Sequence, residues 1–561
     1  MHRLAAMPGG WEAGAEGVIF IEQTPAPVVI LTAADTDIQV LAKAITQLPD
    51  DAPELRVANL LQLQQQLTID TYAEEVLSKA RVIVLRLLGG RSYWSYGLEV
   101  VQETVAETEA ALLVLPGDDR PDPDLMSQST VPLAQVNQLW RYFTEGGIEN
   151  SIAALQFLSH SYLEYGVEPS PPQTIARVAL YPWQAVCREL SGEISEHSAT
   201  ALHWPLRPPK SGRRVPKVPF NSVDDLPVPS MPSAGSETFE AQRRYLANAE
   251  AAPNPDRDAK VGILFYRAHY LAGNTDMIDA LCRGLREQGL DPVPVFVQSL
   301  QAAENQAELL DILQADGIDL LINTTSFSLA KLSAETLNLQ LWEQLNVPVL
   351  QAICSGGTEE NWRAQLRGLS PRDMAMNVAL PEVDGRIISR AISFKAVQAR
   401  HVALETDVIS YRPVCDRIQF VTQLAANWIK LRRTPVAARR VALILANYPN
   451  RDGRLANGVG LDTPASCIEI LKAMTAEGYD LEDIPTDGDQ LIERLTTGIT
   501  NDPEAQDLRV RYQYLSLADY RQYFAELPEI VQQQIRDRWG SPEQYIEANG
   551  FAIAGLQFGQ I

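Results

Sequence analysis

The sequence predicts a multidomain α/β protein, with doubly wound parallel sheets of the Rossmann or flavodoxin kind and a helical region. Short apolar runs recur along the chain, and each is followed by a polar loop and then by apolar residues at helical spacing. Such alternation of strand and helix is typical of parallel sheets covered on both faces. A length of 561 residues is enough for several domains.

Changes in this pattern divide the chain into four predicted regions. They are an N-terminal α/β domain at 1–175, a strand with a proline-rich excursion or linker at 176–259, an α/β domain at 260–435, and the start of a further α/β domain with a helical segment at 436–561.

The strands are predicted from their apolar runs. In the first domain these are PVVILT, ARVIVLRLL and AALLVLP, followed by a helical stretch at 133–165. The third region has GILFY, IDLLINTTS and VPVLQAI, and the fourth opens with VALILA at 441–446. The excursion contains RPPKSGRRVPKVP, whose prolines and basic residues indicate a loop or linker.

Composition restricts the function. The chain has 71 acidic and 47 basic residues and a formal net charge of −24, which disfavours binding to nucleic acid or to an anionic membrane. No apolar run is long enough for a membrane span. The five cysteines are scattered, without a CxxC pair, which favours a reducing cytoplasm.

Polar side chains are concentrated just after two of the predicted strands. The strand at 261–266 is followed by Arg267, His269 and Asn274. The strand at 441–446 leads into a second polar loop, with Asn447, Asp452, Arg454, Asn457 and Asp462. One such loop is explained by turn formation. Two of them favour a ligand site, since open α/β sheets bind ligands beyond the carboxyl ends of their strands.

The chain has no nucleotide-binding cradle. Neither GxxxxGK[ST] nor a GxGxxG following a strand is present, and ANGVGLDT at 456–463 lacks the lysine that a P-loop needs. We therefore expect no ATP hydrolysis by this chain.

Five long collinear motifs resemble the large subunits of the class I metal chelatases, the CobN and magnesium chelatase family. They are ILFYRAHYLAGNTDMIDAL, NTTSFS, VPVLQAICSGGTEENW, GLSPRDMAMNVALPEVDGRI and LANYPNRDGRLANGVGLDTPAS. The first of them is more similar to the cobalt-inserting branch. The resemblance implies insertion of Co²⁺ into hydrogenobyrinic acid a,c-diamide in cobalamin biosynthesis. It also implies partner AAA+ subunits that carry the ATP and its Mg²⁺.

Two other functions stay open. One is insertion of Mg²⁺ into protoporphyrin IX, and the other is a non-catalytic module that binds a tetrapyrrole or docks partners. Family members are about twice as long as this chain, and their second half carries a motif of the type HFGTHG, which is missing here. We therefore expect an N-terminal half that is inactive by itself.

Metal insertion needs a base for the inner NH protons, ligands for the cation, and donors for the ring's side arms. Glu382, Asp384 and His269 are the catalytic candidates, and Glu382 and His269 are also the candidate metal ligands. The candidate substrate-binding residues are Arg267, Asn274, Ser355, Glu359, Asn447, Asp452, Arg454, Asn457 and Asp462. The competing interpretations are solvated turn carboxylates, a structural histidine and salt-bridged surface loops.

Overall fold

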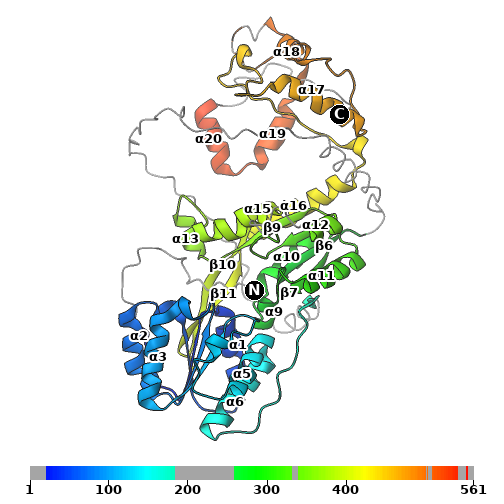
Figure 1. Cartoon of the computed structure of the whole chain (residues 1–561). Coiled ribbons are helices and arrows are strands. Elements are labelled where there is room, and N and C mark those ends of the chain that lie inside the picture. The colour runs from blue at the N-terminus through cyan, green and yellow to red at the C-terminus, as the bar shows by residue number, and fades with distance from the viewer. Residues whose placement is uncertain are drawn as a thin grey trace. The chain divides into compact units, whose positions relative to one another are not determined.

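The computed structural model has two compact units, Met1–Ile429 and Lys430–Ile561 (Figure 1). It describes residues 20–183, 258–330, 339–500, 502, 504, 508–540 and 551–553. The predicted proline-rich stretch and its basic patch lie outside these residues. The domain boundaries near 175, 259 and 435 stay predictions.

The first sheet of the first unit is wholly parallel. Its strands are β1 (Val28–Thr32), β2 (Leu55–Asn59), β3 (Val82–Leu87) and β4 (Ala111–Pro116), in the order β2-β1-β3-β4. All residues of β1, β2 and β3 are buried, which requires cover on both faces.

Helices supply that cover. One core packs β1 against α1 (Asp35–Ile45), α5 (Leu133–Glu145) and α6 (Ile148–Leu163). The opposite core packs it against α2 (Gln66–Glu75) and α3 (Ser95–Thr108), with the short α4 (Pro123–Met126) after β4. Trp94, in the aromatic sequence RSYWSYG at 91–97, belongs to this second core. The 3₁₀ turns are η1 (Leu60–Leu63), η2 (Leu77–Lys79) and η3 (Arg91–Trp94).

The second sheet has seven strands in the order β11-β10-β9-β8-β6-β7-β5. They are β5 (Val178–Leu180), β6 (Lys260–Tyr266), β7 (Asp291–Val297), β8 (Leu320–Asn323), β9 (Val349–Ser355), β10 (Ile387–His401) and β11 (Thr406–Pro413). β5 and β11 are antiparallel to their neighbours, and the other pairs are parallel. The predicted α/β class with parallel sheets is confirmed.

Helices again cover both faces of this sheet. One core contains α10 (Asp276–Glu287) and α16 (Cys415–Arg433), and the opposite core contains α11 (Ala303–Asp316) and α12 (Gln340–Leu345). The shorter helices are α9 (Arg267–Ala272), α13 (Glu359–Ala364), α14 (Pro371–Asp373), a π-helix labelled η4 (Met374–Ala379) and α15 (Leu380–Val383). The segment after β6, predicted as a loop, is therefore the helix α9.

A long hairpin joins the two sheets. In Figure 1, β10 and β11 extend from the second sheet to the first. The turn between them places the fully buried Leu404 in the core of the first sheet, together with Val408 from β11. Gln23 Nε2 donates to the Leu404 carbonyl at 3.2 Å, and Arg56 Nη2 lies 3.3 Å from Glu405 Oε1. Buried apolar contacts and charge-assisted bonds thus hold the sheets together within this unit.

Asp279 on α10 supports a prediction about stability. It is buried, and its Oδ2 accepts long hydrogen bonds from Thr275 at 3.3 Å and Tyr181 at 3.4 Å. Burial raises the pKa of this carboxyl. Because the folded-state pKa is above the unfolded one, the group favours folding at acid pH, and this contribution is lost as pH rises through the folded pKa. Asp279→Asn should therefore raise the Tm at pH 7 by roughly 2 °C, and the gain should vanish near pH 3.

Thermal melts at both pH values test this expectation, and Glu287→Gln, at the exposed C-terminal end of the same helix, is the control. A variant at position 279 less stable than wild type at pH 7 would show that hydrogen bonding outweighs the desolvation of the carboxylate.

The second unit is mainly helical. Its helices are α17 (Thr463–Ala476), α18 (Gly488–Thr497), α19 (Leu517–Glu526) and α20 (Glu529–Trp539), with the 3₁₀ turns η5 (Val436–Ala438) and η6 (Asp452–Arg454). β12 (Gln513–Leu515) pairs antiparallel with β13 (Phe551–Ile553). Asp462 caps the N-terminus of α17, because its Oδ1 accepts from Ala465 N at 2.9 Å.

The predicted strand at 441–446 is wrong. These residues form no strand, and the side chains of Val441, Leu443 and Ile444 are largely exposed. An apolar run becomes a strand only where an adjacent strand supplies partners for its backbone hydrogen bonds. The described part of this unit offers β12 with β13 and isolated bridges such as Asn447 with Leu455.

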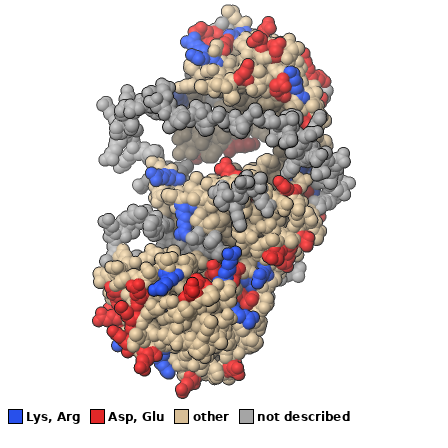
Figure 2. Space-filling model, in the orientation of Figure 1, with Lys and Arg blue, Asp and Glu red and all other residues tan. Residues whose placement is uncertain are grey.

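Acidic side chains are spread over both units on the face drawn in Figure 2, interspersed with basic ones. No helix among the described residues is long and apolar enough to cross a lipid bilayer.

Candidate functional site

Each sheet of the first unit has a topological switch point. In the order β2-β1-β3-β4 the winding reverses between β1 and β3, and in the second sheet it reverses between β6 and β8. Loops on either side of such a point diverge, which opens a crevice at the carboxyl ends of the strands. A ligand site is therefore expected among the residues that follow β1, β6 and β8.

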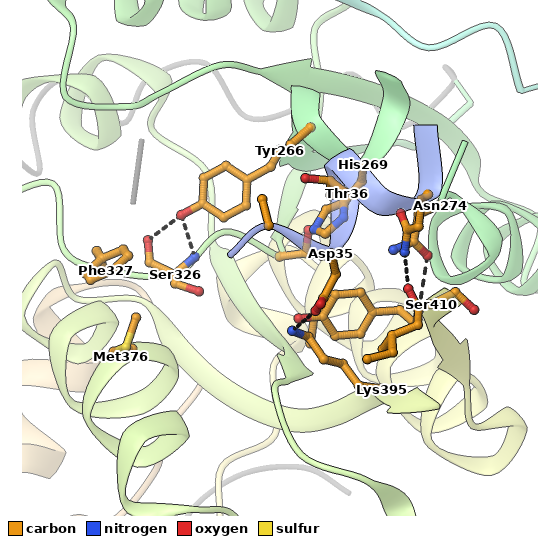
Figure 3. Close-up of a pocket in the computed structure, with 17 residues that line it drawn as sticks. Asp35, Thr36, Tyr266, His269, Asn274, Ser326, Phe327, Met376, Lys395 and Ser410 are labelled. Atoms are coloured by element: carbon orange, nitrogen blue, oxygen red, sulfur yellow. Dashed lines mark hydrogen bonds and ion pairs between the residues drawn. The ribbon is translucent and has the colours of Figure 1, made fainter. Parts of the chain in front are cut away.

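A cavity of about 130 Å³ is lined from both switch points (Figure 3). We call it the junction cavity. Its lining residues are Ala34, Asp35, Thr36, Gln39, Tyr266, Ala268, His269, Asn274, Thr324, Ser326, Phe327, Cys354, Met376, Lys395, Ile409, Ser410 and Tyr411. The predicted His269 and Asn274 meet here, brought together by α9 and the loop behind it.

The size of the junction cavity limits what it can hold. A cavity of about 150 Å³ accommodates one benzene ring, whereas pockets for whole ligands span about 300–1,000 Å³. A macrocycle cannot enter entirely, but one of its side arms can.

The two full charges in the cavity wall neutralise each other. Lys395 Nζ, from β10, lies 2.6 Å from Asp35 Oδ2, at the start of α1, and both side chains are less than one-tenth exposed. Asn59 Nδ2 donates to the other oxygen of Asp35 at 3.1 Å. This ion pair crosses from one sheet to the other. Asp35, the first residue of α1, therefore serves as an inter-sheet contact.

Aromatic rings form the apolar part of the wall. The His269 ring lies edge-on to Tyr411 at 5.4 Å between centroids. Tyr411 N donates to Asn274 Oδ1 at 3.1 Å, which orients that amide. Burial raises the pKa of Tyr411 well above its ordinary value, and it raises the pKa of Cys354 to about 11. Both groups are therefore neutral at pH 7.

The backbone is unusual on one side of the cavity. Phe327 has a φ of 66°, a left-handed conformation that is rare for a bulky residue. Its N–H donates to the carbonyl of Met376 at 2.8 Å, within the π-helix. Strained residues and π-helical turns both cluster at functional sites, which marks this wall as part of one.

A buried polar chain supports that wall. Tyr266 Oη accepts from Ser326 N at 3.1 Å, and Ser326 Oγ lies 2.6 Å from Asn377 Oδ1. Asn377 Nδ2 in turn donates to Asp373 Oδ1 at 3.0 Å. These bonds connect the end of β6 to the π-helix.

The SGGT turn binds a carboxylate of its own chain. Ser355 Oγ lies 2.8 Å from Asp373 Oδ2, and Gly356 N donates to Asp373 Oδ1 at 3.0 Å. Glu359 pairs with Arg363 at 2.6 Å on the surface. Neither predicted residue, Ser355 or Glu359, lines the junction cavity.

Arg267 holds the first sheet's helices in place. Its guanidinium is buried and donates to the carbonyls of Ala176 and Glu145, both at 2.8 Å, and of Ile175 at 3.1 Å. Desolvation by burial lowers its pKa. This geometry favours a structural role over a clamp on a substrate carboxylate.

The two carboxylates of LPEVDG are in different environments. Asp384 is fully buried, pairs with Arg386 at 2.6 Å, and accepts from Leu329 N at 2.7 Å and Ala330 N at 3.0 Å. Glu382 is exposed on α15. The backbone geometry thus gives Asp384 a positioning role, and Glu382 is the member of the pair that can meet a ligand.

Two of the five predicted residues of the second unit line an open hollow. Asn457 and Asp462 are part of its lining, Arg454 is exposed beside it, and Asn447 Oδ1 accepts from Arg451 N at 3.3 Å. Asp452 is tied to Thr500 Oγ1 at 2.6 Å and to Arg509. Val459 and Leu461 are strongly exposed on the same loop.

Among the described residues, no three histidine, cysteine, aspartate or glutamate side chains gather into a group that could hold a metal ion. His269 lines the junction cavity and Glu382 does not, so the cavity does not bring the two proposed ligands together.

Sequence reasoning missed Asp35, Lys395, Phe327 and Asp373. Asp35 had a signal, because it follows the first apolar run as His269 follows another. Lys395 sits within a strand and has no local signal.

Comparison with known proteins identifies the family. The sequence pattern described as CobN/Magnesium Chelatase matches residues 140–561. This chain belongs to the CobN/magnesium chelatase family. It is 40% identical, over 100% of its length, to the aerobic cobaltochelatase subunit CobN of Pseudomonas aeruginosa, and 37% identical to that of Sinorhizobium sp.. The chain spans 40% of the length of each relative.

Two further relatives define the range of the similarity. A magnesium-chelatase subunit of Chlorobaculum parvum is 28% identical over 61% of this chain and 27% of its own length. The solved catalytic subunit of cobaltochelatase from Mycobacterium tuberculosis has a TM-score of 0.56 and 26% identity, covering 95% of this chain and 38% of that one. The resemblance seen in the sequence motifs is thus confirmed.

Proposed function

We propose that this chain is the N-terminal part of the tetrapyrrole-binding large subunit of an ATP-dependent cobaltochelatase. In this role it takes part in inserting Co²⁺ into hydrogenobyrinic acid a,c-diamide during cobalamin biosynthesis in the cytoplasm. The observation that carries the proposal is the 40% identity to a CobN subunit along the whole chain. The similarity to a magnesium-chelatase subunit is lower and covers 61% of the chain.

ATP hydrolysis belongs to partner AAA+ subunits in this proposal. The absence of a P-loop from these 561 residues agrees with a nucleotide and its Mg²⁺ held by partner subunits. Co²⁺ is the substrate metal, and the fragment is expected to be inactive in insertion by itself.

Residues of the junction cavity hold a ring arm in this proposal. The amide and hydroxyl groups of Asn274, Ser326 and Ser410 offer donors and acceptors, and Tyr266 and Tyr411 offer apolar walls. His269 and Glu382 are the proposed groups for receiving inner NH protons or contacting the metal. Loss of two ring protons compensates the charge of the incoming divalent cation.

A non-catalytic binding module is the second candidate. It is favoured by the finding that the described residues contain no three-ligand metal cluster. In that case the chain captures the tetrapyrrole, and the metal-handling groups lie elsewhere in the complete enzyme.

Ring binding tests the proposal directly. A corrin-type ring with acetate, propionate and amide arms should quench tryptophan fluorescence of this chain more strongly than protoporphyrin IX, because polar arms match the polar cavity wall. Titrations with both rings, corrected for absorption, give the two affinities. Equal or tighter binding of protoporphyrin IX would favour the magnesium-inserting alternative.

A further inference from the structure

We propose that the junction cavity selects a neutral amide arm of the ring over a carboxylate arm, through the charge balance of Asp35 and Lys395. The inference rests on the proposed tetrapyrrole binding, and it assigns arm selectivity to one place in the fold. The cavity of about 130 Å³ has room for an acetamide-sized or propionamide-sized group.

The charge balance follows from the lining residues. Asp35 and Lys395 carry opposite charges 2.6 Å apart, and they point toward each other in Figure 3. The neighbouring titratable groups are His269, Cys354, Tyr266 and Tyr411. Burial raises the pKa of Tyr266 to about 12, so this phenol is neutral like Tyr411. The charges of Asp35 and Lys395 thus offset each other in the cavity wall.

A carboxylate arm entering this cavity loses its hydration without gaining a countercharge. Lys395 is already matched by Asp35, and a buried charge without compensation is strongly unfavourable. An amide arm has no charge to desolvate. It can accept from Lys395 and donate to Asp35, and the hydroxyls of Thr36 and Ser410 lie in the same wall.

The experiment uses two corrin-type rings that differ only in two arms, acetamide in one and acetate in the other. Calorimetric titration of the whole chain with each ring gives the two affinities. We expect wild type to bind the amide ring about tenfold more tightly or better.

Two variants shift the selectivity in opposite directions. Asp35→Asn keeps the shape of the side chain and leaves Lys395 without its carboxylate, so it should bring the preference to parity or reverse it toward acetate. Lys395→Met leaves the Asp35 carboxylate without its ammonium partner, so it should increase the preference for the amide ring over the acetate ring. A general loss of folding cannot produce opposite shifts. Asp316→Asn is the control, because it breaks an ion pair of 2.9 Å with Lys260 outside the cavity; it should change nothing.

The outcomes separate this inference from the proposed function. Equal affinity of wild type for both rings, unaltered in Asp35→Asn, overturns the inference and leaves ring binding intact. Absence of binding by either ring contradicts the proposed function. Ligand-observed NMR with free acetamide and acetate then still tests the cavity. The inference is supported if wild type binds acetamide more tightly than acetate and if Asp35→Asn reduces or reverses this preference. Any other pattern overturns it.

Discussion

Replacing Asp384 with asparagine is expected to reduce the free energy of unfolding by about 3–5 kcal/mol. The Asp384 and Arg386 side chains are at most 1% exposed and lie 2.6 Å apart. Without the carboxylate, a guanidinium stays buried with no countercharge, which costs far more than loss of a surface pair. The two backbone N–H groups of Leu329 and Ala330 also lose a charged acceptor. Urea unfolding followed by circular dichroism measures the change.

Two controls make this result specific. Glu359→Gln removes an exposed ion pair to Arg363 and should cost less than about 1 kcal/mol. The double variant Asp384→Asn with Arg386→Met removes both charges and should recover part of the loss. A single Asp384 variant as stable as wild type would show that water or another group replaces the carboxylate, contrary to the geometry.

Glu382→Gln is expected to lower the rate of metal insertion about a hundredfold while leaving tetrapyrrole binding and stability nearly unchanged. The side chain is exposed on α15, so the isosteric change disturbs no buried contact. Loss of a positioned base typically costs a factor of about 10²–10⁴. The measurement is single-turnover insertion by the complete large subunit supplied with its ATPase partners and ATP.

Asp384 supplies the comparison for this second prediction. Its substitution should destabilise the fold, whereas substitution of Glu382 should affect the chemistry alone. Metal insertion by Glu382→Gln at the wild-type rate would show that Glu382 is an exposed carboxylate at a helix end with no part in the chemistry. The role of base would then pass to His269 or to residues outside the described chain.

Much of the local structure was predictable from the sequence. Completely buried strands such as β1 and β3 consist mostly of apolar residues, and Asp462 lies where a helix cap is needed. The polar residues after β6 and β8 also lie at a switch point, as parallel topology requires. These features depend on neighbours in the chain.

Other features depended on which segments pack together. The apolar run at 441–446 pairs with no described strand, so its hydrophobicity predicted a strand that is absent. Glu382 and Asp384 are two residues apart, yet one is exposed and the other fully buried. Spacing alone cannot distinguish them, because burial is set by the residues that pack against each side chain.

The sequence by itself determined the α/β class, most strands of both sheets, the family, and the candidates His269 and Asn274. Only the tertiary structure decided that these two residues share a cavity with Asp35 and Lys395, which are 360 positions apart in the chain. The hairpin of β10 and β11 brings them together by inserting Leu404 into the core of the first sheet. Such a long-range contact leaves no periodic trace in the sequence, because its energy comes from surfaces that meet only after both sheets have formed.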